Sequence, residues 1–162
     1  QAVIARGETI ARNMTSTSAS ETNKRNLLLA EDDVIVRFVL AAQLRRSGYA
    51  VIEAVSGEEA KAVLVAGPEL GVLLSDAQLA GEHSGFALAQ WVRRHRKSIE
   101  VILAASLSAK VQAVCDLCKR LGKKCDAAAI TTRIQGMLAE RKRRMRLPSS
   151  TAAGLTPKRK RS

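Results

Sequence analysis

The sequence predicts one α/β domain, in which a parallel β-sheet carries helices on both faces. Short apolar runs of strand length alternate about five times with segments whose apolar residues recur at helical spacing. The length of 162 residues suits one domain with tails, and a hydrophobic content of 46% is enough to build its core. Because only 2% of the residues are aromatic, this core must consist mainly of Leu, Val, Ile and Ala.

The first strand–helix unit begins at residues 27–30, Leu-Leu-Leu-Ala. A short run without polar residues is typical of a strand that is buried on both faces. Val36, Leu40 and Leu44 then recur at helical spacing, and Gly48 supplies a helix end. We therefore expect a central strand followed by a helix.

The second unit repeats this order. Residues 49–54 are predicted to form a strand, and Ser56 followed by Glu59 is a capping box that begins a helix. Gly67 and Pro68 end that helix. Residues 71–75, Gly-Val-Leu-Leu-Ser, are predicted to form a third strand.

The remaining elements become less regular toward the C-terminus. A third helix is predicted over 84–96, a fourth strand over 101–106 and a helix near 108–119. A segment with only a weak strand signal follows, and Asp126 can then cap a last helix. One face of this helix carries Ile130, Ile134, Met137 and Leu138.

The two ends differ from the middle in composition. Residues 1–26 include a Ser/Thr/Asn-rich stretch and residues 141–162 are basic, so both are predicted to be disordered around a domain at 27–140. Met14 resembles a natural start, which would make residues 1–13 an upstream extension. From residue 139 to the end, nine Lys or Arg oppose one Glu, so most of the net charge of +12 belongs to the tail.

Carboxylates follow two of the predicted strands. Glu31 and Asp32 come directly after the first strand, and Asp76 comes directly after the third. In parallel sheets of this class, ligands bind beyond the carboxyl ends of the strands. Three converging carboxylates repel each other, and a hard divalent cation such as Mg²⁺ relieves that repulsion.

The motifs "LLLAEDDVIVRFVLAAQLRRSGYAVIEAVSGEEA" and "VLLSDAQLAGEHSGFALAQWVR" resemble the receiver domain of two-component response regulators, the CheY-like family. The resemblance covers residues 27–140 and is closest to stand-alone single-domain receivers. It implies a flavodoxin-like, doubly wound sheet of five parallel strands in the order 2-1-3-4-5, with a shortened fifth strand.

The resemblance also implies roles for individual residues. Asp76 matches the aspartate that accepts a phosphoryl group. Glu31 and Asp32 match the acidic pair that binds Mg²⁺ together with Asp76, and Gln78 would offer its backbone carbonyl to the metal. Asp33 matches a third acid that does not bind the metal directly.

The last third departs from the family pattern. Ala105 stands where the family has a Thr or Ser that contacts the phosphoryl group, and the neighbouring Ser106 is a weaker candidate. Lys123 is at the position of the phosphate-holding lysine after strand five, with Lys124 as a substitute in place of the usual Pro. Ala80 also replaces a Pro in the loop after Asp76. These changes predict a weak or altered response to phosphorylation.

The three cysteines, Cys115, Cys118 and Cys125, are expected to be reduced thiols of a cytoplasmic protein. A zinc site is disfavoured because no fourth ligand is in view. The sequence contains no convincing signal peptide and no apolar run long enough to cross a membrane.

Three other side chains are expected to have structural roles and not to take part in the site. His83 is expected to be a solvated loop histidine rather than a phosphoryl contact. His95 is expected to add charge at a helix C-terminus, and Trp91 to pack at helical spacing.

The predicted function is that of a bacterial response regulator receiver in a phosphorelay, and not that of an enzyme. Asp76 would accept phosphate from a sensor histidine kinase or a phosphotransfer protein, with Mg²⁺, and signal by contact with an unknown output protein. One alternative is a degenerate, phosphorylation-independent interaction module; another is a small phosphotransferase or phosphatase. The basic tail keeps weak nucleic-acid binding open, although a nucleic-acid partner is not expected, and a homodimer through the later helices also stays open.

Overall fold

The computed structural model describes residues 24–67 and 69–146. Within them, four parallel strands form one sheet in the order β2-β1-β3-β4. The strands are β1 (Asn26–Ala30), β2 (Ala50–Ala54), β3 (Val72–Asp76) and β4 (Glu100–Ala104). The helices are α2 (Val34–Ser47), α3 (Gly57–Ala66), α4 (Gly85–His95), α5 (Leu107–Arg120) and α6 (Ala127–Arg146). The predicted α/β class with helices on both faces is confirmed.

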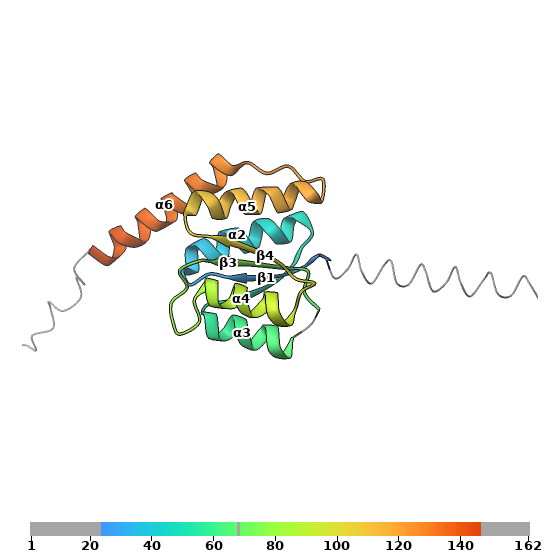
Figure 1. The fold of residues 1–162 in the computed structure, drawn as a ribbon. Helices are drawn as coiled ribbons and strands as arrows, with labels where there is room; N and C mark the ends of the chain where they lie inside the picture. The colour runs from blue at the N-terminus through green and yellow to red at the C-terminus, as the bar shows by residue number, and fades with distance from the viewer. Residues whose placement is uncertain (1–23, 68, 147–162) are drawn as a thin grey trace, which may run out of the picture.

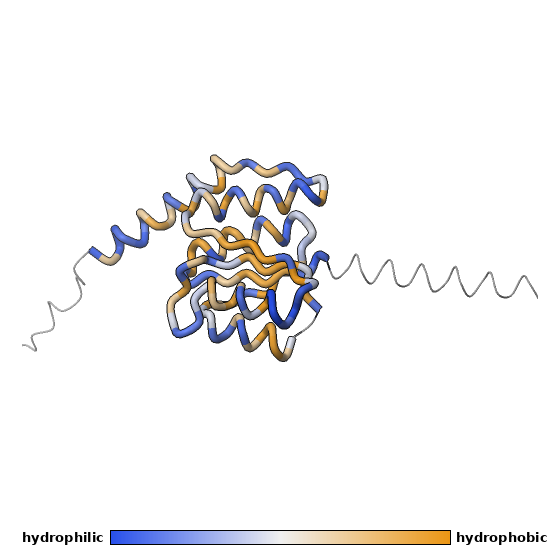
Figure 2. The backbone as a smooth tube through the Cα atoms, viewed as in Figure 1, coloured by the Kyte–Doolittle hydropathy of each residue, from blue (hydrophilic) through white to orange (hydrophobic). Residues whose placement is uncertain are grey.

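The alternation of side chains along β1 builds two cores, one on each face of the sheet. Leu27 and Leu29 are buried against α2, α5 and α6, whereas Leu28 and Ala30 are buried against α3 and α4. Figure 1 shows these two helical layers on opposite sides of the sheet. Figure 2 shows that the strands between the layers are hydrophobic, as expected for a sheet covered on both faces.

The helix ends follow from local chemistry. The Asp33 carboxylate caps α2 by accepting the N–H groups of Ile35 and Val36 at 2.8 and 3.1 Å. Gly48 ends α2 with a φ of 108°, in the left-handed region that favours glycine. The predicted start of α3 is confirmed, because the Ser56 hydroxyl accepts the Glu59 N–H at 3.2 Å.

The predicted fifth strand is wrong for the described residues. The segment 121–126 between α5 and α6 is a loop that pairs with no strand, so the sheet order is 2-1-3-4 and not 2-1-3-4-5. The physical reason is its composition: Gly-Lys-Lys supplies no apolar side chains for a buried strand. α5 and α6, on either side of this loop, both pack on the α2 side of the sheet (Figure 1).

The last helix extends beyond the predicted domain boundary. α6 runs from Ala127 to Arg146, so the first residues of the predicted basic tail, 141–146, are helical. The predicted disorder of residues 1–26 is wrong at its end, because Asn26 already belongs to β1. The rest of the predicted disorder, at residues 1–23 and 147–162, lies outside the described residues.

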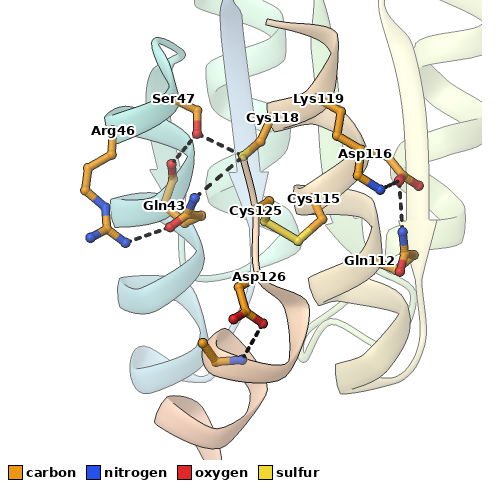
Figure 3. The surroundings of a disulfide bond; sticks show 11 residues. Gln43, Arg46, Ser47, Gln112, Cys115, Asp116, Cys118, Lys119, Cys125 and Asp126 are labelled. Carbon is orange, nitrogen blue, oxygen red and sulfur yellow. Dashed lines mark hydrogen bonds and ion pairs between the residues drawn. A yellow bond between two sulfur atoms is a disulfide. The ribbon is translucent and has the colours of Figure 1, made fainter. Parts of the chain in front are cut away.

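A disulfide joins α5 to the loop before α6. Cys115 and Cys125 are bonded with a Cα–Cα distance of 5.1 Å, so the expectation of reduced thiols is wrong for these two residues. Cys118 remains a free, fully buried thiol whose sulfur receives a hydrogen bond from the Ser47 hydroxyl at 3.0 Å (Figure 3). The bond ties the start of α6 to α5 at the place where the predicted fifth strand is missing.

Candidate functional site

The three predicted carboxylates meet at the carboxyl edge of the sheet. Glu31 and Asp32 follow β1, and Asp76 ends the adjacent strand β3. One ligand atom from each side chain lies within 4.8 Å of the others. Glu31 is buried, Asp76 is partly buried and Asp32 is exposed, so the cluster opens to solvent on the Asp32 side.

An ammonium group links two of these carboxylates. The Lys110 Nζ lies 2.6 Å from Glu31 Oε2 and 2.8 Å from Asp76 Oδ2. Its side chain is only 12% exposed, and it projects from the first turn of α5. The Ser106 hydroxyl caps this turn by accepting the Ala109 N–H at 3.2 Å, so the cap holds Lys110 in place.

The pKa values of the pair follow from burial and charge. Burial raises the pKa of Glu31, although the hydrogen bond and charge of Lys110 oppose the shift. Burial acts to lower the pKa of Lys110, but hydrogen bonds and charge from Asp76 and Glu31 outweigh it, so its pKa is raised. Lys110 therefore stays cationic at neutral pH, and Glu31 is the carboxyl that takes up a proton more readily than usual.

A second cation reaches the cluster from α6. The Arg141 Nη2 lies 2.7 Å from Asp33 Oδ2, while Oδ1 of the same carboxylate caps α2. Burial acts to raise the pKa of Asp33, but the hydrogen bonds from Arg141 and from the backbone of α2 prevail and lower it. The Asp33 N–H in turn donates to Glu31 Oε1 at 3.1 Å. The last helix is thus connected to the acidic site through one ion pair.

The loop after β3 approaches Asp76 closely. The Gln78 N–H donates to Asp76 Oδ1 at 2.8 Å. The Gln78 carbonyl, which is the predicted metal-binding group, belongs to the same turn after β3. A Cβ on Gly85 would collide with the Asp76 carbonyl, so only a glycine at this position allows α4 to begin so close to Asp76. Glu58 holds the outer part of the loop by accepting the N–H groups of Glu82 and His83.

The donor set fits a magnesium ion. Carboxylate and carbonyl oxygens are the ligands that Mg²⁺ prefers, and it is normally held by one or two carboxylates with water. Among the residues that the structure describes, no group donates a hydrogen bond to the Asp32 carboxylate, whereas Glu31 and Asp76 are both engaged by Lys110. The exposed Asp32 side of the cluster is therefore the side on which a cation fits.

Comparison with known proteins decides the family. The sequence model described as the response regulator receiver domain matches residues 27–135. The chain belongs to the response regulator receiver family. It is a receiver domain of two-component signalling, and its acidic cluster is consistent with the phosphorylation site of such domains.

Solved receiver structures are also similar to this receiver. The chemotaxis response regulator CheY4 of Vibrio cholerae is 24% identical over 55% of this chain and 78% of its own, with a TM-score of 0.45. A putative response regulator from Chloroflexus aurantiacus is 26% identical over 71% of this chain and 98% of its own, also with a TM-score of 0.45. A search of curated proteins found no match.

The lysine near the receiver's Asp76 is not the one the sequence predicted. Lys123 and Lys124 lie in the loop that follows the C-terminal end of α5. α5 begins at the carboxyl edge of the sheet and runs back to the amino edge, where Leu121 lies beside the start of β3. Without a fifth strand to return the chain to the carboxyl edge, these lysines stay at the far edge.

The predicted hydroxyl group also has another partner. Ser106 caps α5 and contacts the Ser108 hydroxyl at 3.1 Å, and Ala105 at the end of β4 has no hydroxyl to offer. The signal for Lys110 was present in the sequence, since it lies one helical turn after a Ser that follows a strand. It was missed because the family pattern places the phosphate-holding lysine after strand five.

The other expectations concern the surroundings of the site. The His83 backbone N–H donates to Glu58 and holds His83 in the loop, and His95 stacks on Trp91 with ring centroids 4.7 Å apart at the end of α4.

None of the helices in the described part of the receiver is long and apolar enough to cross a membrane.

Proposed function

We propose that this receiver accepts a phosphoryl group on Asp76 from the phosphohistidine of a sensor kinase or phosphotransfer protein. The observation that carries the proposal is the environment of Asp76: one oxygen accepts the Gln78 N–H and the other accepts the Lys110 ammonium. A carboxylate held between a cation and a backbone amide at an open edge is positioned to attack phosphorus. It is also surrounded by groups that can stabilise the charge that develops on the phosphoryl oxygens.

In the proposed step, an Asp76 carboxylate oxygen attacks phosphorus opposite the imidazole nitrogen of the donor. The new P–O bond forms as the P–N bond breaks, and the released imidazole takes up a proton. The Lys110 ammonium, which pairs with Asp76 at 2.8 Å before the reaction, then donates to a phosphoryl oxygen. Mg²⁺, when bound, neutralises charge on the transferred group. Glu31, Asp32, Asp76 and the Gln78 carbonyl are the groups that would hold it.

The response to phosphate would pass through α5 and α6. Ala105 supplies no hydroxyl for the phosphoryl group, but Lys110 belongs to α5 itself, and Arg141 connects α6 to Asp33. A phosphoryl group on Asp76 competes for Lys110 and so favours a different position of α5. We infer that these helices present the signal to an output protein in the cytoplasm, and that the chain acts without enzymatic turnover of its own.

The test is intact mass spectrometry after incubation with phosphoramidate or acetyl phosphate and Mg²⁺. One added phosphoryl group on the wild type, absent in Asp76→Asn and in the presence of EDTA, is the expected result. Asp116→Asn, which alters an exposed carboxylate on α5, serves as the matched control and should be modified like the wild type. A wild type that stays unmodified would refute the proposal.

A second candidate is a phosphorylation-independent interaction module. It is favoured by the Lys110 ammonium, which already compensates Glu31 and Asp76 without a metal ion. This candidate predicts that Mg²⁺ does not change the chemical shifts of Asp32 and Asp76, and that Asp76→Asn binds the output partner like the wild type. Chemical-shift changes at these residues that give a millimolar or lower dissociation constant for Mg²⁺ would exclude this candidate.

A further inference from the structure

A pocket of about 1040 Å³ lies at the amino edge of the receiver, away from the acidic site. It is formed by the last turns of α2 and α5, the loop 121–126 and the first turns of α6. Val39 and Ile130 form its apolar floor, and the disulfide-bonded Cys125 lies in its wall. Figure 3 shows this region, where the Arg46 guanidinium donates to the Gln43 side-chain oxygen at 2.6 Å and Gln43 lies between Arg46 and Cys125.

The rim of this pocket is strongly cationic. Its five basic residues are Arg46, Lys119, Lys123, Lys124 and Arg133. The only carboxylate in the lining is Asp126, and its Oδ1 is already engaged by the Ala129 N–H at 3.0 Å. Among the described residues, Lys119 pairs with Asp116 at 3.6 Å, and none of the other four cations forms an ion pair.

Helix dipoles explain only part of this charge. Arg46 and Lys119 lie in the last turns of α2 and α5, where cations are favourable in any protein. Lys123 and Lys124 lie beyond these helices, and Arg133 lies in the second turn of α6. Three cations therefore line the same pocket although neither a helix C-terminus nor an ion pair among the described residues accounts for them.

We propose that this pocket binds a phosphorylated organic anion of nucleotide size, through at least two phosphate groups. Two guanidinium groups and three ammonium groups offer the charge-assisted hydrogen bonds that phosphate oxygens accept best. The apolar floor between Val39 and Ile130 suits the organic part of such a ligand. The volume of about 1040 Å³ is slightly above the usual range for small-molecule sites, roughly 300–1000 Å³, so the pocket has room for a nucleotide-sized ligand. Since the pocket is at the opposite edge from Asp76, a ligand bound there would not contact the phosphoryl-transfer site.

The experiment is isothermal titration calorimetry of the full chain, under non-reducing conditions with EDTA, using ADP, pyrophosphate, AMP and adenosine as probes. EDTA prevents a metal–nucleotide complex from binding at the acidic cluster. We expect ADP to bind more tightly than pyrophosphate or AMP, and adenosine not to bind. Lys123→Gln and Arg133→Gln should each weaken ADP binding about ten-fold, because each removes one charge-assisted contact. Lys97→Gln, which removes one exposed charge outside the pocket, should leave the affinity within about two-fold.

Three results would overturn the proposal. ADP that does not bind at millimolar concentration excludes a nucleotide-sized phosphate ligand. Equal losses in Lys97→Gln and Lys123→Gln show that only the net charge of the protein is sensed. Pyrophosphate that binds as tightly as ADP shows that the apolar floor contributes nothing and that the site takes free inorganic phosphates. Circular dichroism of each variant verifies that a loss of binding does not reflect unfolding.

Discussion

Replacing Lys110 with Met should make the stability of the receiver depend on the protonation of Glu31. The substitution keeps an unbranched side chain that is one atom shorter and removes the ammonium that lies 2.6 Å from Glu31 and 2.8 Å from Asp76. At an effective dielectric constant of 20, each of these contacts has a Coulomb energy of roughly 6 kcal/mol before desolvation is subtracted. Removing one partner of a buried ion pair typically costs about 3–5 kcal/mol, because the remaining charge stays buried and uncompensated. The Glu31 side chain is only 3% exposed, so we expect about 3 kcal/mol at pH 8.

The sign of the pH dependence follows from the pKa of Glu31. Burial already raises this pKa, and the variant loses the hydrogen bond and charge that oppose the rise, so the pKa goes up further. A carboxyl group whose pKa is higher in the folded state favours folding when it is protonated. The variant therefore regains stability as the pH is lowered toward the raised pKa of Glu31.

Urea denaturation at pH 8 and pH 5 measures this difference. The free energy of unfolding of Lys110→Met should be lower than that of the wild type at pH 8, and the difference should be smaller at pH 5. Lys97→Met, at an exposed position, is the matched control and should show no such change. A destabilisation by Lys110→Met that is below about 1 kcal/mol, or that is equal at both pH values, would refute the electrostatic account of Lys110.

Three further substitutions test other parts of the structure. Arg141→Gln should cost about 0.5–1 kcal/mol at pH 7, since its ion pair with Asp33 is partly exposed, and this cost should disappear in acid-range urea melts as the pH falls through the lowered pKa of Asp33. Cys125→Ser opens a disulfide loop with a sequence separation of 10 and should cost roughly 2.5–3 kcal/mol in urea; reductant should lower the stability of the wild type equally but not that of the variant. Ser106→Ala removes the cap of α5 and should cost about 1 kcal/mol by thermal melting, whereas Ser106→Asp should retain the wild-type stability. A Ser106→Ala variant as stable as the wild type would show that the cap does not determine where α5 begins.

The elements that were predicted correctly are those with a strong local signal. The apolar run of β1 and the cap of α3 at Ser56 are properties of neighbouring residues, so the sequence alone indicates them. The convergence of Glu31, Asp32 and Asp76 follows once parallel strands are inferred, because the carboxyl ends of adjacent strands share an edge.

The features that were missed depend on tertiary structure. Lys110 reaches Asp76 across 34 residues of sequence, and only the packing of α5 on the α2 side of the sheet brings it there. The Cys115–Cys125 bond likewise depends on where the loop before α6 folds back. The fifth strand was inferred from the family pattern although the residues at 121–126 carry little strand signal. The composition of that segment was the better guide.

The missing fifth strand leaves β4 as the outer strand of the described sheet. Glu100 N–H and Ala104 C=O pair toward β3, so by alternation the peptide groups of Val101 and Leu103 point away from the sheet and have no partner among the described residues. Proteins usually protect such an edge strand from pairing with another molecule by means of lysine, proline or a bulge. β4 is protected only by its short length and by Glu100, which forms an ion pair with Arg120 at 2.6 Å. Edge-to-edge pairing of the β4 strands of two molecules is thus the aggregation route that this architecture leaves open.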